Sequence, residues 1–262
     1  MPPRKPEPWA GVRDAFENGP TAPQLGGPPN PLILNHRQPA VEGEDCLVMN
    51  IFTPGENDNR KRPVMVWLHG GGFASGAGSA HSFDGNFLAR SGDVVVVSVN
   101  HRLNIFGHLY LADVGGEKYA DSGNVGLLDI VAVLEWVRDN VVHFGGNPGN
   151  VTLFGQSGGG LKISTLLAMP PAKGLFHKAI IESGSLLKGI HREDANKTTE
   201  RILAKLNLQS NQVDELQKLP VDRLLSVIDT RGTPPGSAPI NLAPVVDGRA
   251  LPSDPFDPMA GR

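Results

Sequence analysis

Ser157 has the surroundings that a nucleophilic serine requires. It lies in Gly155-Gln156-Ser157-Gly158-Gly159, directly after the apolar residues 151–154 and before a helical stretch that ends at Ala168. Glycines two positions before and after the serine allow a sharp strand-to-helix turn, because a Cβ would clash there. The helix would direct backbone N–H groups and its positive end at the reacting centre. Gly-x-Ser-x-Gly alone also fits a structural turn, but the flanking strand and helix favour Ser157 as the attacking residue.

A run of three glycines upstream could supply the second part of the same chemistry. His69-Gly70-Gly71-Gly72-Phe73 follows the apolar residues 63–68. Glycines let the backbone approach a substrate carbonyl, and each N–H donor aimed at the developing oxyanion is worth roughly 3–4 kcal/mol in the transition state. A flexible loop is the alternative for this run alone; we expect His69 to brace the loop and not to act as a base. The site residues predicted beside Ser157 are the oxyanion donors Gly71, Gly72 and Gly158 and the substrate contacts Phe73 and Gln156.

The elements that must position these residues alternate between strands and helices. The predicted strands are residues 46–52, 63–68, 94–99, 151–154 and 179–181. Residues 94–99 are continuously apolar, as strands covered on both faces of a parallel sheet are. Apolar residues recur every three or four positions from Leu127 to Val141, which predicts an amphipathic helix with Asn124 as its N-cap. Residues 191–228 alternate charged and apolar positions, as surface helices do. This alternation predicts the α/β class, with a mostly parallel sheet flanked by helices, in one domain over residues 1–262.

Composition and charge exclude several classes of partner. The 262 residues include 27 acidic and 24 basic side chains, a net charge of −3, which creates no field for nucleic acid or an anionic lipid surface. No apolar run reaches the length of a membrane span. The histidines show no paired metal-ligand spacing. We therefore expect no nucleic-acid or membrane partner and no metal, and the oligomeric state is left open.

Further motifs occur in a fixed order along the chain. They comprise residues 44–47, 69–73, 83–85, 100–103, 106–107, 123–127, 144–159, 174–179 and 244–248. Together they resemble the signatures of the type-B carboxylesterases, a family that includes cholinesterases, animal liver carboxylesterases and bacterial para-nitrobenzyl esterases. The resemblance extends over essentially the whole chain. It implies an α/β-hydrolase fold and acyl transfer through Ser157, with no cofactor.

Two departures from the family pattern bear on substrate and location. The family usually carries Glu before the nucleophile, and Gln156 removes that negative charge and with it one reason to expect cationic substrates. The cysteine that pairs with this one in secreted relatives would fall near Ala22, so Cys46, the single cysteine, is expected to be unpaired. Unpaired cysteines are typical of reducing compartments. We expect an intracellular, cytoplasmic protein of bacterial type.

The resemblance also implies that the catalytic triad is incomplete in this chain. The family order is Ser, then Glu or Asp, then His, and both partners of Ser157 are expected beyond Arg262. The first residues resemble a stretch that normally follows an N-terminal hairpin, so truncation at both ends and an exposed sheet edge are expected. His177 and His191 match neither the order nor the spacing of a triad base. For Glu182, after the next strand, a pocket-facing and a solvated carboxylate are both open.

The expected function is hydrolysis of a small carboxylic ester through an acyl-enzyme on Ser157. As a fragment without the triad acid and histidine, the chain alone should turn over weakly or not at all. One alternative is a non-catalytic, cholinesterase-like adhesion or binding protein, although such relatives usually lose the nucleophile. Another is a lipase or carbamate hydrolase of the same fold, because the acyl and alcohol pockets are built largely by residues outside this chain.

Overall fold

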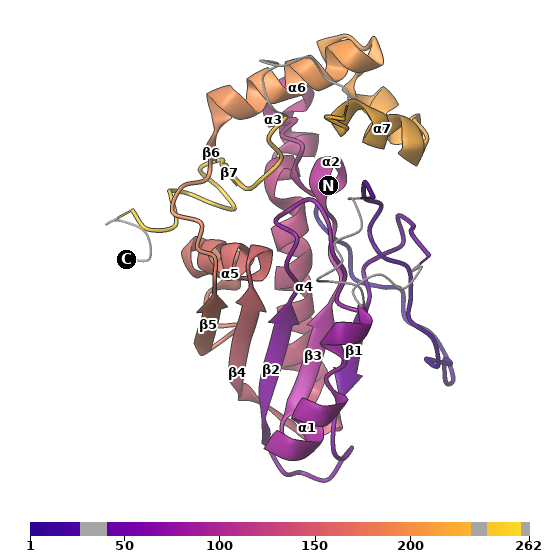
Figure 1. The fold of residues 1–262 in the computed structure, drawn as a ribbon, viewed down its shortest axis with the longest axis vertical. Coiled ribbons are helices and arrows are strands. Elements are labelled where there is room, and N and C mark those ends of the chain that lie inside the picture. The colour runs from indigo at the N-terminus through magenta and orange to yellow at the C-terminus, as the bar shows by residue number, and fades with distance from the viewer. Residues whose placement is uncertain (27–40, 232–239, 258–262) are drawn as a thin grey trace.

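A five-stranded sheet forms the centre of the computed structural model, which describes residues 1–26, 41–231 and 240–257 (Figure 1). The strands are β1 (Met49–Phe52), β2 (Arg62–Leu68), β3 (Val95–Val99), β4 (Gly146–Gln156) and β5 (Lys178–Glu182). Their order across the sheet is β1-β3-β2-β4-β5. Only the β1–β3 pair in this sheet is antiparallel, and the other three pairs are parallel. The predicted mostly parallel sheet is therefore confirmed.

Helices flank the sheet and extend past its carboxyl edge. They are α1 (Asn86–Gly92), α2 (Asn104–His108), α3 (Ala112–Gly115), α4 (Val125–Asn140), α5 (Gly158–Ala168), α6 (Arg192–Leu206) and α7 (Val221–Ile228). A short parallel pair, β6 (Ile190–His191) and β7 (Val245–Val246), leads into α6. Figure 1 shows α3, α6 and α7 above the ends of the parallel strands, which is the side where β4 passes into α5.

The main core lies between the sheet and helices α4 and α5. Alternate residues of β2, such as Val66, are fully buried against Leu134 of α4 and Ile163 of α5. On the opposite face, a smaller cluster packs Val96 and other sheet residues against Ala89 of α1. Because both faces are covered, every residue of β3 is buried, which explains why its sequence is almost continuously apolar.

The edge strand β5 is the exposed side of the sheet. Four of its five residues are exposed, and Ile180 keeps 43% of its surface. An edge strand presents unpaired backbone groups along its free side. This is the exposed edge that the sequence leads us to expect.

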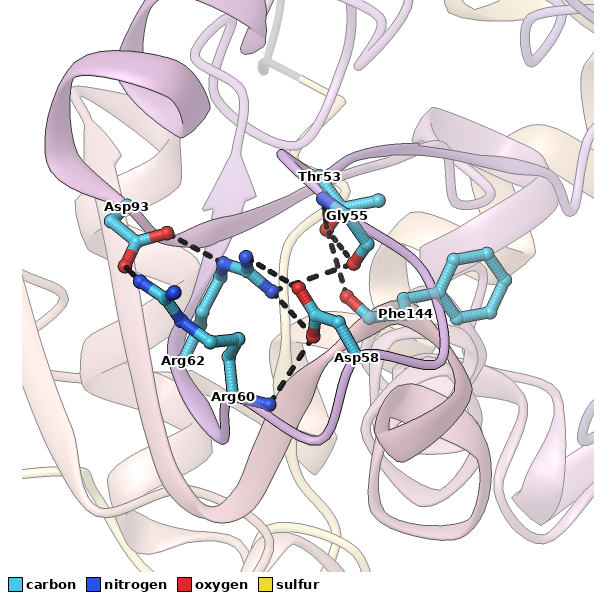
Figure 2. A network of polar contacts seen from close by, with 7 residues as sticks. All are labelled: Thr53, Gly55, Asp58, Arg60, Arg62, Asp93 and Phe144. Carbon is cyan, nitrogen blue, oxygen red and sulfur yellow. Dashed lines mark hydrogen bonds and ion pairs between the residues drawn. The ribbon is translucent and has the colours of Figure 1, made fainter.

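A polar network lies at the amino end of β2, at the opposite end of the sheet from the start of α5. Arg62 is 6% exposed and pairs with Asp93 at 2.6 Å and with Asp58 at 2.7 Å (Figure 2). Arg60 reaches Asp93 as well, at 3.2 Å. The Arg62 guanidinium lowers the pKa of both carboxyls, chiefly through these hydrogen bonds. The network joins the loop before β2 to the end of α1.

Two predicted strands differ from the structure at their first residues. β1 begins at Met49 and not at Cys46, because the thiol packs with Ala22 and Leu103 in a separate small cluster away from the sheet. β4 begins at Gly146, five residues before the predicted start, because Gly146 already pairs with Arg62 of β2. The remaining predicted strands agree with the structure within about one residue at each end, which is the usual uncertainty of an element boundary.

Asn124 occupies the N-cap position of α4 as predicted, but its side chain does not cap the helix. Its amide nitrogen donates to the carbonyl oxygen of Val245 at 2.8 Å and to Asp247 at 2.9 Å, and its amide oxygen accepts from the Val245 N–H at 3.0 Å. Asn124 thus joins α4 to a segment more than a hundred residues away. The expected surface helices within 191–228 are present as α6 and α7.

Candidate active site

Ser157 lies at the junction of β4 and α5 in a backbone conformation that few side chains adopt. Its φ is 53° and its ψ is −117°. Such strained geometry persists only where neighbouring structure enforces it, and it is typical of a nucleophile elbow. The Ser157 N–H donates to the carbonyl of Glu182 in β5 at 2.8 Å, while its own carbonyl accepts from the Leu161 N–H of α5 at 3.1 Å. Strand and helix together hold the turn.

Close backbone packing around the elbow explains its glycines. A Cβ at Gly155 would lie 2.7 Å from the Leu68 carbonyl oxygen, and a Cβ at Gly184 would lie 2.4 Å from the Ser157 oxygen. Gly184 follows β5 and was not predicted from the sequence. The sequence signal that could have identified it is its position in Ser183-Gly184, just after an apolar strand. Ser183 itself has a positive φ of 53°.

The glycine loop after β2 lies directly against the elbow. Gly71 and Gly72 have φ values of +88° and +62°, which favour glycine. A Cβ built on Gly158 would lie 2.3 Å from the Gly72 nitrogen. Because β2 and β4 are neighbours in the sheet, their carboxyl ends bring these two motifs together. The roles of Gly71, Gly72 and Gly158 as oxyanion donors stay predictions, and this contact supports them.

His69 braces the loop, as expected. It is 1% exposed, its Nδ1 lies 2.8 Å from the Gly70 carbonyl oxygen, and its ring stacks on His101 with centroids 4.9 Å apart. Burial lowers the pKa of both imidazoles well below the ordinary value, and the nearby Lys162 charge adds to the effect. Both rings are therefore neutral at pH 7, and they pack in the interior while a ring nitrogen of each contacts a backbone carbonyl.

Lys162 is a polar residue beside this loop that the sequence alone did not identify. It is fully buried in α5, and its Nζ donates to the His69 carbonyl oxygen at 2.7 Å. Burial lowers the pKa of its ammonium to about 7. The available signal was its charge, since Lys162 is the single charged residue within the apolar and small residues of α5.

The other predicted positions divide between core and surface. Phe73 is 6% exposed and lies edge-on to His108, with ring centroids 5.1 Å apart. Gln156 is exposed beside Ser157, and the Glu182 side chain is exposed as well. The substrate contacts assigned to Phe73 and Gln156 stay predictions.

The two histidines that follow Ser157 make other contacts. The Nδ1 of His177 accepts a hydrogen bond from the Val151 N–H at 3.1 Å. The His191 side chain is 65% exposed and lies 4.0 Å from Asp254. Within residues 1–26, 41–231 and 240–257, no hydrogen bond joins a histidine ring to the Ser157 hydroxyl.

Cys46 is a free, buried thiol, as expected. In the part of the chain that the structure describes, no helix is long and apolar enough to cross a membrane. Among those same residues, no group of three or more His, Cys, Asp or Glu side chains could hold a metal ion.

A strained serine between a parallel strand and a helix, with a glycine loop packed against it, defines the α/β-hydrolase class of serine hydrolases. The chain belongs to the Carboxylesterase family, whose sequence model matches residues 1–261. The predicted fold and family are both confirmed.

Relatives and solved structures agree with this assignment. The chain is 42% identical over 260 residues to the para-nitrobenzyl esterase of Bacillus subtilis, covering 98% of this chain and 52% of that protein. It is 37% identical to carboxylesterase 1D of Rattus norvegicus, covering 99% of this chain and 48% of that protein. A crystal structure of a carboxylesterase from Geobacillus stearothermophilus matches with a TM-score of 0.85 at 42% identity, covering 97% of this chain and 50% of that one. The chain thus spans about half the length of these relatives.

Proposed function

We propose that this chain supplies the nucleophile and oxyanion hole of a serine carboxylic ester hydrolase. The observation that carries the proposal is the contact between Gly158 of the elbow and Gly72 of the glycine loop. This contact supports the proposal, because it lies between the segments that follow two neighbouring strands, next to the strained Ser157. Such an arrangement suits a substrate whose carbonyl oxygen gains negative charge during the reaction.

The proposed mechanism is acyl transfer in two halves. Ser157 Oγ attacks the ester carbonyl, and the N–H groups of Gly71, Gly72 and Gly158 stabilise the tetrahedral oxyanion. A general base takes the serine proton and returns it to the leaving alcohol, so that an acyl-enzyme remains. Water then attacks this ester by the same route, which releases the acid and restores the serine.

The base and its orienting carboxylate belong, in this proposal, to residues outside this 262-residue chain. His69 supports this because it is buried, neutral and turned to the Gly70 carbonyl. His177 supports it because its Nδ1 accepts from the Val151 backbone. Without a base, the oxyanion hole and substrate binding alone give about 10³–10⁴-fold over water.

The substrate class proposed is a small carboxylic ester. The relatives' printed names, para-nitrobenzyl esterase and carboxylesterase, support it for the family. Phe73 and Gln156 are proposed to contact substrate, and the uncharged Gln156 favours neutral over cationic esters. The cytoplasm is the proposed location, since the single cysteine is free and buried.

Hydrolysis of para-nitrophenyl acetate tests the proposal on three proteins: the 262-residue chain, the polypeptide encoded by the complete gene, and its Ser157→Ala variant. We expect turnover by the complete polypeptide, loss of that turnover in Ser157→Ala, and little turnover by the chain alone. Turnover that survives Ser157→Ala would contradict Ser157 as nucleophile. Fast, Ser157-dependent turnover by the chain alone would show that a base lies within these residues.

Fluorophosphonate labelling separates this proposal from a non-catalytic binding protein. The probe forms a covalent bond with an activated serine, so the complete polypeptide should be labelled and Ser157→Ala should not. An intact elbow that resists labelling would favour the adhesion alternative. Relative kcat/KM values for short acyl esters, long acyl esters and carbamates then separate an esterase from a lipase or a carbamate hydrolase.

A further inference from the structure

Lys162 is buried without a carboxylate partner. It is the largest of the fully buried side chains, and no carboxylate within the described ranges pairs with its ammonium. Burying an uncompensated charge is unfavourable, and the lowered pKa of this group, about 7, reflects the same cost. Lys162 therefore works against the stability of the fold, unlike the apolar residues that surround it in α5.

The one hydrogen bond that Nζ makes in the described structure joins two parts of the active site. Lys162 lies in the helix that starts behind the nucleophile, and its acceptor, the His69 carbonyl, is the last peptide group before the glycine run. The same His69 is held on its other side, where its ring contacts the Gly70 carbonyl and stacks on His101. The residue at the base of the loop is thus held through both its backbone and its ring.

The glycine loop is held only through its backbone at Gly70, Gly71 and Gly72, because these residues offer no side chain that could pack or bond. Two of them have left-handed backbone angles. A segment with such conformational freedom keeps its N–H groups aimed at one point only if its ends are fixed. At the downstream end, the Asn104 N–H of α2 donates to the Phe73 carbonyl at 2.7 Å. At the upstream end, Lys162 performs this task from α5.

We propose that Lys162 is a positioning residue that holds the glycine loop in register with Ser157 through the His69 carbonyl. It does not act on substrate, and with Nζ committed to His69 it is not the base for Ser157. The hydrogen bond survives loss of the charge, because a neutral amine keeps N–H donors. The inference rests on the proposed function, since it assigns Lys162 a part in that reaction.

The test compares Lys162→Met with the parent in the polypeptide encoded by the complete gene. Methionine is unbranched and of similar length, but it lacks the donor and the charge. We expect kcat per fluorophosphonate-titrated site to fall by about tenfold or more. The loss should be smaller than the roughly 10²–10³-fold loss from deleting an oxyanion donor. KM should stay within about twofold, because the lost interaction acts only in the transition state. The melting temperature should be equal or higher, because a buried charge is removed.

A transition-state analogue provides a second readout. A trifluoromethyl ketone adds to the serine and places its oxyanion in the hole, so its Ki should rise in Lys162→Met by the same factor as KM/kcat. Thr165→Val is the matched control, because Thr165 is also fully buried in α5, but among the residues that the structure describes its hydroxyl bonds within the helix, to the Leu161 carbonyl. This control should keep the parent kcat and Ki. If Lys162→Met does not fold, Lys162→Gln, which keeps a shorter donor, is judged by the same quantities.

The two proposals fail in different ways. If the parent shows Ser157-dependent turnover and Lys162→Met matches its kcat per titrated site and its Ki, the positioning role is overturned and the proposed function stands. Equal losses in Lys162→Met and Thr165→Val would also overturn it, since they indicate general damage to α5. Parent turnover that is independent of Ser157 would overturn the proposed function itself.

Discussion

Gly159 faces the carbonyl oxygen of Leu68 so closely that a Cβ on residue 159 would lie 2.0 Å from that oxygen. The contact joins the first turn of α5 to the last residue of β2. It therefore sets the separation between the elbow that carries Ser157 and the loop that begins at His69. A side chain here would push the helix away from the strand end, because the obstructing atom belongs to backbone within the sheet.

We expect Gly159→Ala to lower the free energy of unfolding by about 3 kcal/mol or more, since overpacking against backbone cannot relax through a rotamer change. Gly92→Ala is the control, because the nearest atom to its Cβ would be Val94 Cγ2 at an ordinary 3.5 Å. Urea denaturation followed by circular dichroism measures both. A Gly159→Ala variant within about 0.5 kcal/mol of the parent, the range of neutral substitutions, would contradict the packing described.

The ion pair between Arg102 and Asp129 gives a second prediction. Asp129 is 1% exposed in its side chain, lies 2.6 Å from the Arg102 guanidinium, and also accepts from the Arg102 backbone N–H at 3.0 Å. Breaking a buried pair leaves its partner charge uncompensated, so Asp129→Ala should cost about 3–5 kcal/mol of unfolding free energy. Asp139→Ala is the matched control. Its pair with Arg138 is about half exposed on both sides, and its loss should cost at most about 1 kcal/mol. Similar losses in the two variants would show that burial does not strengthen the Arg102 pair.

Stability should rise with pH above neutrality because of Lys162. Its pKa is about 7 in the folded state and about 10.4 in an unfolded chain. Between these values the unfolded chain binds a proton that the folded protein does not, so raising the pH favours folding. Below about pH 7 both states carry the charge, and the full cost of burying it is present. From pH 7 to 8.5 the parent should gain on the order of 1–2 kcal/mol relative to Lys162→Met.

Cys46 sets about pH 8.5 as the upper limit of the range in which stability should rise with pH. Burial raises the pKa of its thiol to about 11, so above the unfolded value of about 8.5 it acts in the opposite direction. Denaturation curves of the parent and Lys162→Met at pH 7.0, 7.75 and 8.5 provide the comparison. Parallel pH profiles for the two proteins would show that Lys162 keeps an ordinary pKa.

Much of the fold could be predicted because its strands and helices are marked by local pattern. The continuous apolarity of β3 reflects coverage on both faces, and the three-to-four residue spacing from Leu127 to Val141 reflects the buried side of α4. The strand boundaries were less predictable. Whether Cys46 or Gly146 belongs to a strand depends on which distant segment lies beside it.

The same division holds for the site, and the physical reason is how far apart in the sequence the contacting residues lie. The sequence by itself determined the elbow at Ser157 and the glycine loop at Gly70–Gly72, because each requires particular residue types at fixed spacing within one turn of chain. Only the tertiary structure decided that Asn124 bonds to Val245, that Gly184 packs on Ser157, and that Lys162 reaches His69. These contacts join segments from 27 to 121 residues apart, and no local pattern encodes them. Folding brings them together through the order of the strands in the sheet.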